Sequence, residues 1–153
     1  MKTYIHYGSN KFDPEKFEPV HNRLFFTKPS GGLWASAVGI GGWKAWCEQE
    51  DFPCSDQYFC FRLRNPAKVA VIRSIADAEN LPQQDYIPIL GMVGSDTETA
   101  RIDFEALKKQ GIDAVELEWY EVANSGKDNM YMYMYGWDCD SIVVLNPDAV
   151  VPV

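Results

Sequence analysis

Residues 28–50, KPSGGLWASAVGIGGWKAWCEQE, join a pair of glycines, a short apolar run and a helix-like segment. The two glycines directly before LWAS predict a turn that leads into a strand. Within WKAWCEQE, residues 43–50, the side chains of Trp43, Trp46 and Cys47 recur at the i, i+3 and i+4 positions of one helical face. This stretch therefore predicts a strand followed closely by a helix, with large indole side chains near glycines.

Strand-like and helix-like segments continue on both sides of this unit. Short β-branched and aromatic runs bounded by turn residues predict strands, and apolar residues at helical spacing predict helices. The alternation of Met and Tyr in MYMYMY has the period of two that is typical of a strand. The predicted strands are 3–9, 23–29, 31–36, 56–64, 67–74, 111–122, 130–140 and 141–153, and the predicted helices are 43–50, 74–82 and 99–111. Many strands and few helices predict an α+β fold dominated by β-structure.

The composition limits the class of protein. A chain of 153 residues has the size of one domain, so we predict a single domain over residues 1–153. The chain is 14% aromatic, which favours a compact core and a ligand pocket. The formal net charge of −8 argues against general nucleic-acid binding, because such binding depends on Lys and Arg residues that neutralise phosphates.

The cysteines and the hydrophobic runs indicate the compartment in which the protein resides. None of the four cysteines belongs to a C-x-x-C pair, so we expect reduced thiols and no metal site. The N-terminus has no apolar core of a signal peptide, and no run approaches the ~20 apolar residues of a membrane span. We therefore expect a cytoplasmic protein without a membrane partner.

Four short motifs contain residues that could carry chemistry: HYGS, GGLWAS, WKAWC and DCDSIVVLNPDAV. Taken singly, the tryptophans can be core residues, and the aspartates can be solvated residues at the entrance of a strand. The order of the motifs resembles that of the ADP-ribosyltransferase superfamily, specifically its diphtheria-toxin-like and poly(ADP-ribose)-polymerase-like branch. The corresponding residues are Tyr7-Gly8-Ser9, Gly32-Leu33-Trp34, Trp46-Cys47 and Asp140-Ser141-Ile142-Val143.

This resemblance implies a split, two-sheet, β-rich core with a few short helices, a central N-terminal strand and a site for NAD⁺. In the family, an aromatic side chain on the helix stacks on nicotinamide, which is flat and, in NAD⁺, cationic. The resemblance therefore implies that the nicotinamide ring stacks between Trp34 and Trp46. The other NAD⁺-binding positions that it implies are His6, Tyr7, Gly8, Ser9 and Ser36.

The first motif is shifted by one residue from the family pattern of His-Gly-Ser or His-Gly-Thr. Tyr7 directly precedes Gly8, and His6 lies one residue earlier. Adjacent strand residues face opposite sides of a sheet. Either Tyr7 takes the place of the family's histidine, or a bulge turns His6 toward the site. Both residues are candidates.

The last motif contains the candidate catalytic carboxylates. Breaking the bond between ribose and nicotinamide develops positive charge, which a carboxylate stabilises more in the transition state than in the ground state. The resemblance assigns this role to Asp140, with Asp138 two residues earlier on the same strand face. The family has Glu at this motif, so the Asp140 carboxylate reaches roughly 1.5 Å less, which matters where catalysis depends on positioning.

Three interpretations of function remain open. The one we favour is an enzyme, a mono-ADP-ribosyltransferase of toxin, effector or phage type that cleaves NAD⁺ and passes ADP-ribose to a protein or to water. The second is a catalytically silent module of the same fold that binds NAD⁺ or a protein. The third is an unrelated fold in which the aromatic residues form the core. The acidic composition favours a protein acceptor over nucleic acid.

Overall fold

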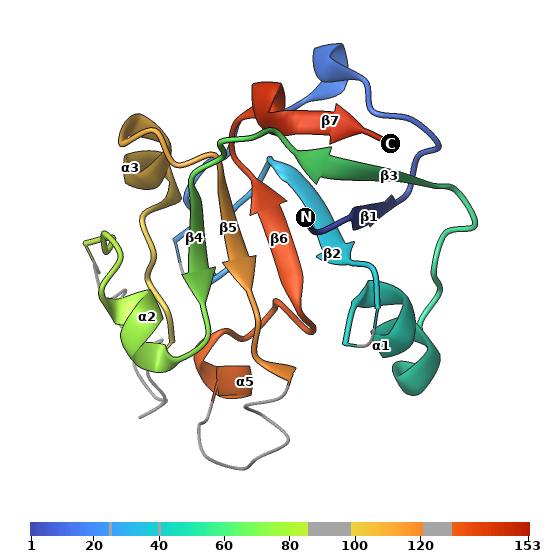
Figure 1. Cartoon of the computed structure of the whole chain (residues 1–153). Coiled ribbons are helices and arrows are strands. Elements are labelled where there is room, and N and C mark those ends of the chain that lie inside the picture. The colour runs from blue at the N-terminus through green and yellow to red at the C-terminus, as the bar shows by residue number, and fades with distance from the viewer. Residues whose placement is uncertain (25, 40, 86–98, 121–129) are drawn as a thin grey trace.

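The computed structural model describes residues 1–24, 26–39, 41–85, 99–120 and 130–153 (Figure 1). These residues form one seven-stranded mixed sheet accompanied by a few short helices, which confirms the predicted α+β class. The strands are β1 (Tyr4–Tyr7), β2 (Leu33–Ala37), β3 (Tyr58–Leu63), β4 (Val69–Ile72), β5 (Ala114–Leu117), β6 (Ser141–Val144) and β7 (Val150–Pro152). The helices are α1 (Trp43–Glu50), α2 (Ile75–Glu79), α3 (Phe104–Lys109) and α5 (Met130–Tyr133), with the 3₁₀ turns η1 (Pro14–Lys16) and η2 (Pro147–Ala149).

Strand β1 lies inside the sheet, as predicted for the N-terminal strand. The strand order is β4-β5-β6-β2-β1-β3-β7, with β4 and β5 parallel and the other neighbouring pairs antiparallel. Strands β1 and β2 are joined through two register pairs, Tyr4 with Ala37 and Ile5 with Ser36, whereas β1 and β3 share four. The β1–β2 ladder is therefore the shorter of the two, but the seven strands form one sheet, so the structure does not show the two separate sheets that the resemblance implied.

Two apolar clusters pack against the sheet. Successive strand residues point to opposite sides, so Leu33 and Ala35 of β2 belong to one cluster while Trp34 packs against the other. The cluster around Trp34 includes buried residues of α3 and α5. The other cluster is made largely of residues from β1, β3, β5 and β6. Strand β2 therefore lies at the centre of the molecule and carries side chains into both clusters.

Residues 130–140 do not form the predicted strand. They form helix α5 and the turn that follows it. Besides Cys139, the buried side chains are those of Met130, Tyr133, Met134 and Trp137, which have the i, i+3, i+4 and i+7 spacing of a helix. Burial along this segment therefore follows the helical spacing and not the period of two in the letters MYMYMY.

The predicted strand at 23–29 is also absent from the residues that the structure describes. The indole N–H of Trp137 donates to the Thr27 carbonyl over 3.2 Å, and the Thr27 hydroxyl donates to the carbonyl of Tyr135. These bonds hold the segment against the turn after α5, in place of a strand ladder.

The single strand predicted for residues 141–153 is two strands, β6 and β7, separated by η2. Pro147 has no backbone N–H to continue a ladder. The side chain of Asn146 accepts the N–H of Asp148 over 3.1 Å and caps the 3₁₀ turn. The chain therefore turns at this point and returns as β7 beside β3.

Asp113 ties three separate segments together. Its buried carboxylate accepts hydrogen bonds from the Lys68 N–H at 2.9 Å, the Asn146 amide at 2.8 Å and the Arg64 guanidinium at 2.9 Å. Burial alone would raise the pKa of this carboxyl, but these donors hold the pKa of Asp113 below its ordinary value. The stabilising contribution of Asp113 is therefore complete above the ordinary pKa of about 3.9 and is lost as the pH falls through the lowered value.

We expect the free energy of unfolding to decrease as the pH is lowered from about 5 toward 2, partly because Asp113 becomes protonated. In Asp113→Asn, the protein is less stable near pH 5 and the decrease with acid is shallower. Urea unfolding at several pH values measures both effects. Asp148→Asn removes an exposed carboxylate and should keep the wild-type slope. An equally steep acid dependence in Asp113→Asn would contradict this role.

Candidate functional site

Strands β1 and β2 separate after Ile5, and a side chain replaces the missing ladder bond. β1 remains paired with β3 through Tyr7, but its register with β2 ends at Ile5. The His6 Nδ1 lies 2.7 Å from the carbonyl oxygen of Trp34. Because a carbonyl can only accept, Nδ1 is the donor, and a neutral imidazole keeps Nε2 as an acceptor. His6 thus links β1 to β2 beyond their last register pair.

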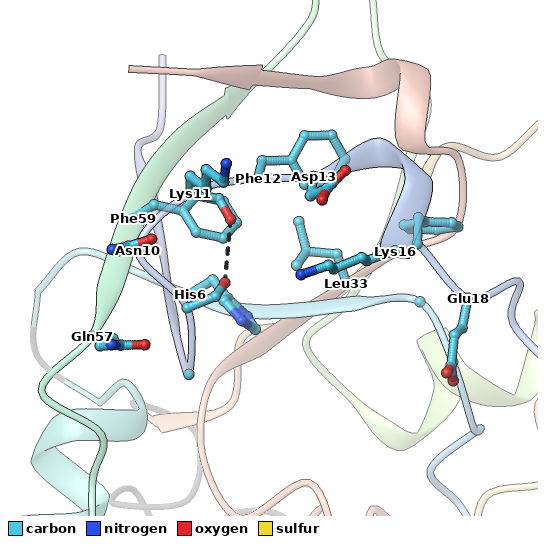
Figure 2. A pocket seen from close by; sticks show the side chains of 15 residues that line it. His6, Asn10, Lys11, Phe12, Asp13, Lys16, Glu18, Leu33, Gln57 and Phe59 are labelled. Atoms are coloured by element: carbon cyan, nitrogen blue, oxygen red, sulfur yellow. Dashed lines mark hydrogen bonds between the residues drawn. The ribbon is translucent and has the colours of Figure 1, made fainter.

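A pocket of about 530 Å³ adjoins this separation (Figure 2). Its volume lies within the range of small-molecule sites, roughly 300–1,000 Å³. His6, Gly8 and Ser9 line it, together with the glycine pair that precedes β2. Much of the loop 10–18, called the pocket loop below, forms the rest of the wall, with residues of β2 and β3. The structure therefore brings the first and second sequence motifs together in one pocket.

Gly8 and Ser9 carry the chain from β1 into the pocket loop. The N–H of Gly8 donates to the Gln57 carbonyl over 2.9 Å, which continues the pairing of β1 with β3. The φ angle of Gly8 is +125°, a backbone conformation that favours glycine. The Ser9 hydroxyl donates to the Lys11 carbonyl over 3.3 Å and so bends the loop over the pocket.

The glycine pair before β2 allows a second segment to approach closely. A Cβ on Gly31 would lie 2.1 Å from the carbonyl oxygen of Pro19. The N–H of Gly32 donates to the Glu18 carbonyl over 2.8 Å. These backbone contacts fix the end of the pocket loop against the start of β2, and they require residues without a side chain.

The pocket walls combine aromatic, cationic and acidic groups. The rings of Phe12 and Phe59 lie 6.1 Å apart, and with Leu33 they form an apolar side. Figure 2 shows the Lys16 side chain extending past Leu33 toward the interior of the pocket. Lys11, in the same loop, also lines the pocket. Aromatic rings stack on flat ligands, and ammonium groups attract anions. Asp13 and Glu18 add two carboxylates to the same lining. The pocket is thus suited to a flat ring, and its lysines offer a local cationic contact for a negatively charged group.

Of the two candidates in the first motif, His6 lines the pocket and Tyr7 does not. The His6 ring lies 5.1 Å from the ring of Phe59, a pocket residue. The Tyr7 ring lies 6.0 Å from that of Tyr58. The two side chains follow the alternation of strand β1, so they occupy opposite sides of the sheet.

Asp140 lies at the start of β6, near the end of β2 that is distant from the pocket. Its Oδ1 accepts the N–H groups of Trp119 at 2.8 Å and Tyr120 at 3.0 Å. Its own N–H donates to the Gly41 carbonyl, just before α1. Burial, with two nearby glutamates, raises the pKa of Asp140 above its ordinary value, although the two N–H donors oppose this. One oxygen of the carboxylate is therefore held in place, next to the start of α1.

Asp138 has different surroundings. Burial raises the pKa of its carboxyl, and the charge of Lys28 opposes the rise. The Lys28 ammonium lies 4.3 Å from the centre of the Trp34 ring, and burial lowers the pKa of Lys28. Asp138 thus lies near Lys28 and Trp34, whereas Asp140 is held by the backbone N–H groups of Trp119 and Tyr120.

Trp34 and Trp46 have separate ring partners. Trp34 packs edge-on against Trp137, with ring centres 4.8 Å apart, and its N–H donates to a backbone carbonyl. Trp46 stacks on Trp43 at 5.1 Å with an angle of 15° between the rings. Within the described ranges no ring contact joins Trp34 to Trp46. A nicotinamide ring stacked between them would therefore require these indoles to change partners.

Ser36 holds the start of α1. Its buried hydroxyl accepts the N–H of Trp43 over 2.9 Å, which satisfies a first-turn amide of the helix. Gly42, at the N-cap position, has no side chain that could cap the helix. Ser36 therefore positions α1 and does not line the pocket.

Residues 13–20 belong to none of the four motifs that the sequence singled out. Asp13, Lys16, Phe17 and Glu18 nevertheless line the pocket, as do Gln57 and Phe59 of the β3 region. One signal was present in the sequence: two lysines and two phenylalanines follow the first motif closely in a chain of net charge −8.

Comparisons with protein-family models, with curated proteins and with solved structures find no match. No helix in the described part of the chain is long and apolar enough to cross a membrane. Among the described residues, no three His, Cys, Asp or Glu side chains are grouped in a way that could hold a metal ion.

Proposed function

We propose that the chain binds NAD⁺ and cleaves its ribose–nicotinamide bond, passing ADP-ribose to a protein or to water. The observation that carries the proposal is the pocket at the separation of β1 and β2. It combines His6, Gly8 and Ser9 with Gly31 and Gly32, which stand far apart in the sequence. These are the two motifs that, in the resemblance to ADP-ribosyltransferases, bind NAD⁺.

The pocket chemistry suits part of a dinucleotide. A purine ring would pack against the apolar side formed by Phe12, Phe59 and Leu33. The ammonium groups of Lys11 and Lys16 would attract the diphosphate. The acceptor Nε2 of a neutral His6 can bind a ribose hydroxyl. The adenosine side of NAD⁺ is therefore the part that we assign to this pocket.

Asp140 is our candidate for the catalytic carboxylate. It lies about 13 Å from the pocket end of β2, since four residues of a strand rise roughly 3.3 Å each. NAD⁺ contains two ribose rings joined by a diphosphate, so its nicotinamide ribose can lie that far from its adenosine. A carboxylate whose Oδ1 is fixed by two N–H groups is preorganised to stabilise the positive charge of the transition state.

One observation favours a second candidate, an NAD⁺-binding module without catalysis. Asp140 has a shorter side chain than the family's glutamate, and its Oδ1 is already engaged by Trp119 and Tyr120. Incubating the protein with NAD⁺ and measuring free nicotinamide by chromatography distinguishes the two. Release above the uncatalysed rate supports the enzyme, and saturable binding without release supports the module. Absence of both binding and release would reject the proposal.

A charge reversal in the pocket loop tests the location of the ligand. Lys16→Glu should weaken NAD⁺ binding about tenfold, because it places a negative charge beside the diphosphate. Calorimetric titration measures the dissociation constant. Lys44→Glu is the matched control, since Lys44 is exposed on α1 and makes the same change in net charge away from the pocket. Equal weakening in both variants would indicate a general charge effect and contradict the assignment to the pocket.

A further inference from the structure

Helix α1 and the turn that follows it carry a cluster of three aromatic rings, those of Trp43, Trp46 and Phe52, called the aromatic surface below. The two indoles stack with ring centres 5.1 Å apart, and the Phe52 ring lies 5.7 Å from Trp43 and 5.4 Å from Trp46. The N–H of Phe52 donates to the Cys47 carbonyl over 2.8 Å, which fixes the turn. Each ring therefore contacts the other two, and the three form one surface.

The aromatic surface lies outside the core. None of its three residues belongs to the two apolar clusters that pack against the sheet. Phe52 is 50% exposed, and both indoles are partly exposed. Figure 1 shows α1 on the side of the molecule away from α2, α3 and α5, so none of these helices covers it. Single exposed apolar residues are common on protein surfaces, but a group of large exposed rings is typical of an interaction site.

Carboxylates accompany the aromatic surface. Residues 43–58 contain one ammonium group, that of Lys44, and four exposed carboxylates, those of Glu48, Glu50, Asp51 and Asp56. Trp43, Trp46 and Glu50 have the i, i+3 and i+7 spacing of one helical stripe, so the Glu50 carboxylate lies on the same side of α1 as the indoles. Among the described residues, none of the four carboxylates forms an ion pair. The aromatic surface is therefore bordered by negative charge that the described residues do not pair.

The end of α1 adds to this negative charge. The last carbonyl groups of a helix have no partner within the helix, and cations nearby stabilise them. The last turn of α1 contains no basic residue, and an aspartate, Asp51, occupies its C-cap position. A positive group from a partner would therefore be attracted both by the carboxylates and by the end of the helix.

We propose that the aromatic surface is a docking site for a basic segment of a partner protein, with an arginine side chain stacked on the exposed rings. A guanidinium group is planar and cationic, so it can stack on an aromatic face and donate hydrogen bonds to a carboxylate such as that of Glu50. The same carboxylates disfavour nucleic acids, which are anionic. They also disfavour a second copy of this chain, because a two-fold contact would place the acidic surface against itself. This inference does not depend on the proposed binding of NAD⁺.

A synthetic peptide in which arginine alternates with glycine, labelled with an uncharged dye, is the probe for this site. Fluorescence anisotropy measures its dissociation constant with the full chain. We expect saturable binding by the wild type, and none of a matched peptide in which glutamate replaces arginine. Phe52→Ala should weaken binding about fivefold or more, because it truncates an aromatic anchor. Glu50→Lys should weaken binding by a similar factor, because it replaces an attraction with a repulsion.

Two variants elsewhere on the surface are the matched controls. Tyr135→Ala removes a ring that is 61% exposed, and Glu79→Lys makes the same charge change at an exposed position of α2. Both should bind the arginine peptide as the wild type does. If Phe52→Ala does not fold, the comparison of Glu50→Lys with Glu79→Lys still decides. Absence of saturable binding at millimolar protein, or equal weakening in the controls, would overturn the proposal. Dimerisation in sedimentation velocity that Phe52→Ala abolishes would also overturn it, because the occupant would then be a second copy.

Discussion

Asp140→Asn is expected to lower the rate of nicotinamide release from NAD⁺ by about 10²–10³-fold, while the affinity for NAD⁺ changes little. The reason is that positive charge on the ribose exists mainly in the transition state, so a missing carboxylate affects the rate more than binding. Asparagine keeps an Oδ1 that can still accept the N–H groups of Trp119 and Tyr120. Chromatography of nicotinamide measures the rate, and calorimetry measures the affinity.

Asp138→Asn is the matched control for this prediction. Asp138 lies two residues earlier, beside Lys28 rather than beside the backbone donors of Asp140. We therefore expect a smaller loss of rate. Equal rates in Asp140→Asn and the wild type would show that Asp140 is not the catalytic carboxylate, and a large loss in Asp138→Asn alone would move the role to Asp138.

Asp140→Glu tests whether the short side chain limits the reaction. If reach is limiting, the variant releases nicotinamide faster than the wild type, because the longer side chain restores the position of the family's carboxylate. Binding of NAD⁺ without release in both proteins would support the module without catalysis. In that case the backbone donors at Oδ1 define a structural role for Asp140.

Local sequence patterns were sufficient for the elements that surround β2. The paired glycines, the apolar residues of β2 and the helical spacing in α1 each depend on neighbours in the sequence, and both elements occur where predicted. The central position of β1 was also predicted, and it is confirmed by the strand order. The glycine turn, β2 and α1 are readable because hydrophobic periodicity and turn residues act over a few positions, whereas the position of β1 was implied by the resemblance.

The patterns failed where tertiary contacts decide the local structure. The letters MYMYMY alternate, but the burial of Met130 and Tyr133 follows a helix because one side of the segment packs into the core. Thr27 is held by Trp137, more than a hundred residues later, and the described residues of 23–29 form no strand, in spite of their strand-like composition. Contacts between residues that are so far apart in the sequence cannot be predicted from a short sequence window.

The candidate site was predictable only in part, for a related reason. His6, Gly8 and Ser9 belong to a short motif, so their grouping is local. That His6 and not Tyr7 lines the pocket depends on how β1 and β2 diverge, where His6 Nδ1 donates to the Trp34 carbonyl. The contribution of residues 10–18 to the pocket wall depends on how the chain passes Gly32. No local sequence pattern specifies that path.

The glycine pair before β2 leads to the prediction with the largest effect on stability. Gly31→Ala is expected to reduce the free energy of unfolding by about 2–5 kcal/mol, the sum of about 1–2 for a left-handed backbone and about 1–3 for overpacking. The φ angle of Gly31 is +71°, and the added Cβ would lie 2.1 Å from the Pro19 carbonyl oxygen. That atom belongs to the backbone, so it cannot move aside as a flexible side chain would. Urea unfolding measures the loss.

Gly111→Ala separates the two causes of this loss. Gly111 has a similar φ of +80°, but a Cβ there would meet no atom within 4 Å. We therefore expect Gly111→Ala to cost about 1–2 kcal/mol from the backbone conformation alone. The difference between the variants then measures the close packing of Pro19 on Gly31. Because this packing fixes the end of the pocket loop, Gly31→Ala should also weaken NAD⁺ binding in the folded protein, whereas Gly111→Ala should not. Equal stability losses in the two variants would mean that the Pro19 segment yields to the added methyl group, and that the wall of the pocket is less rigid than its backbone contacts indicate.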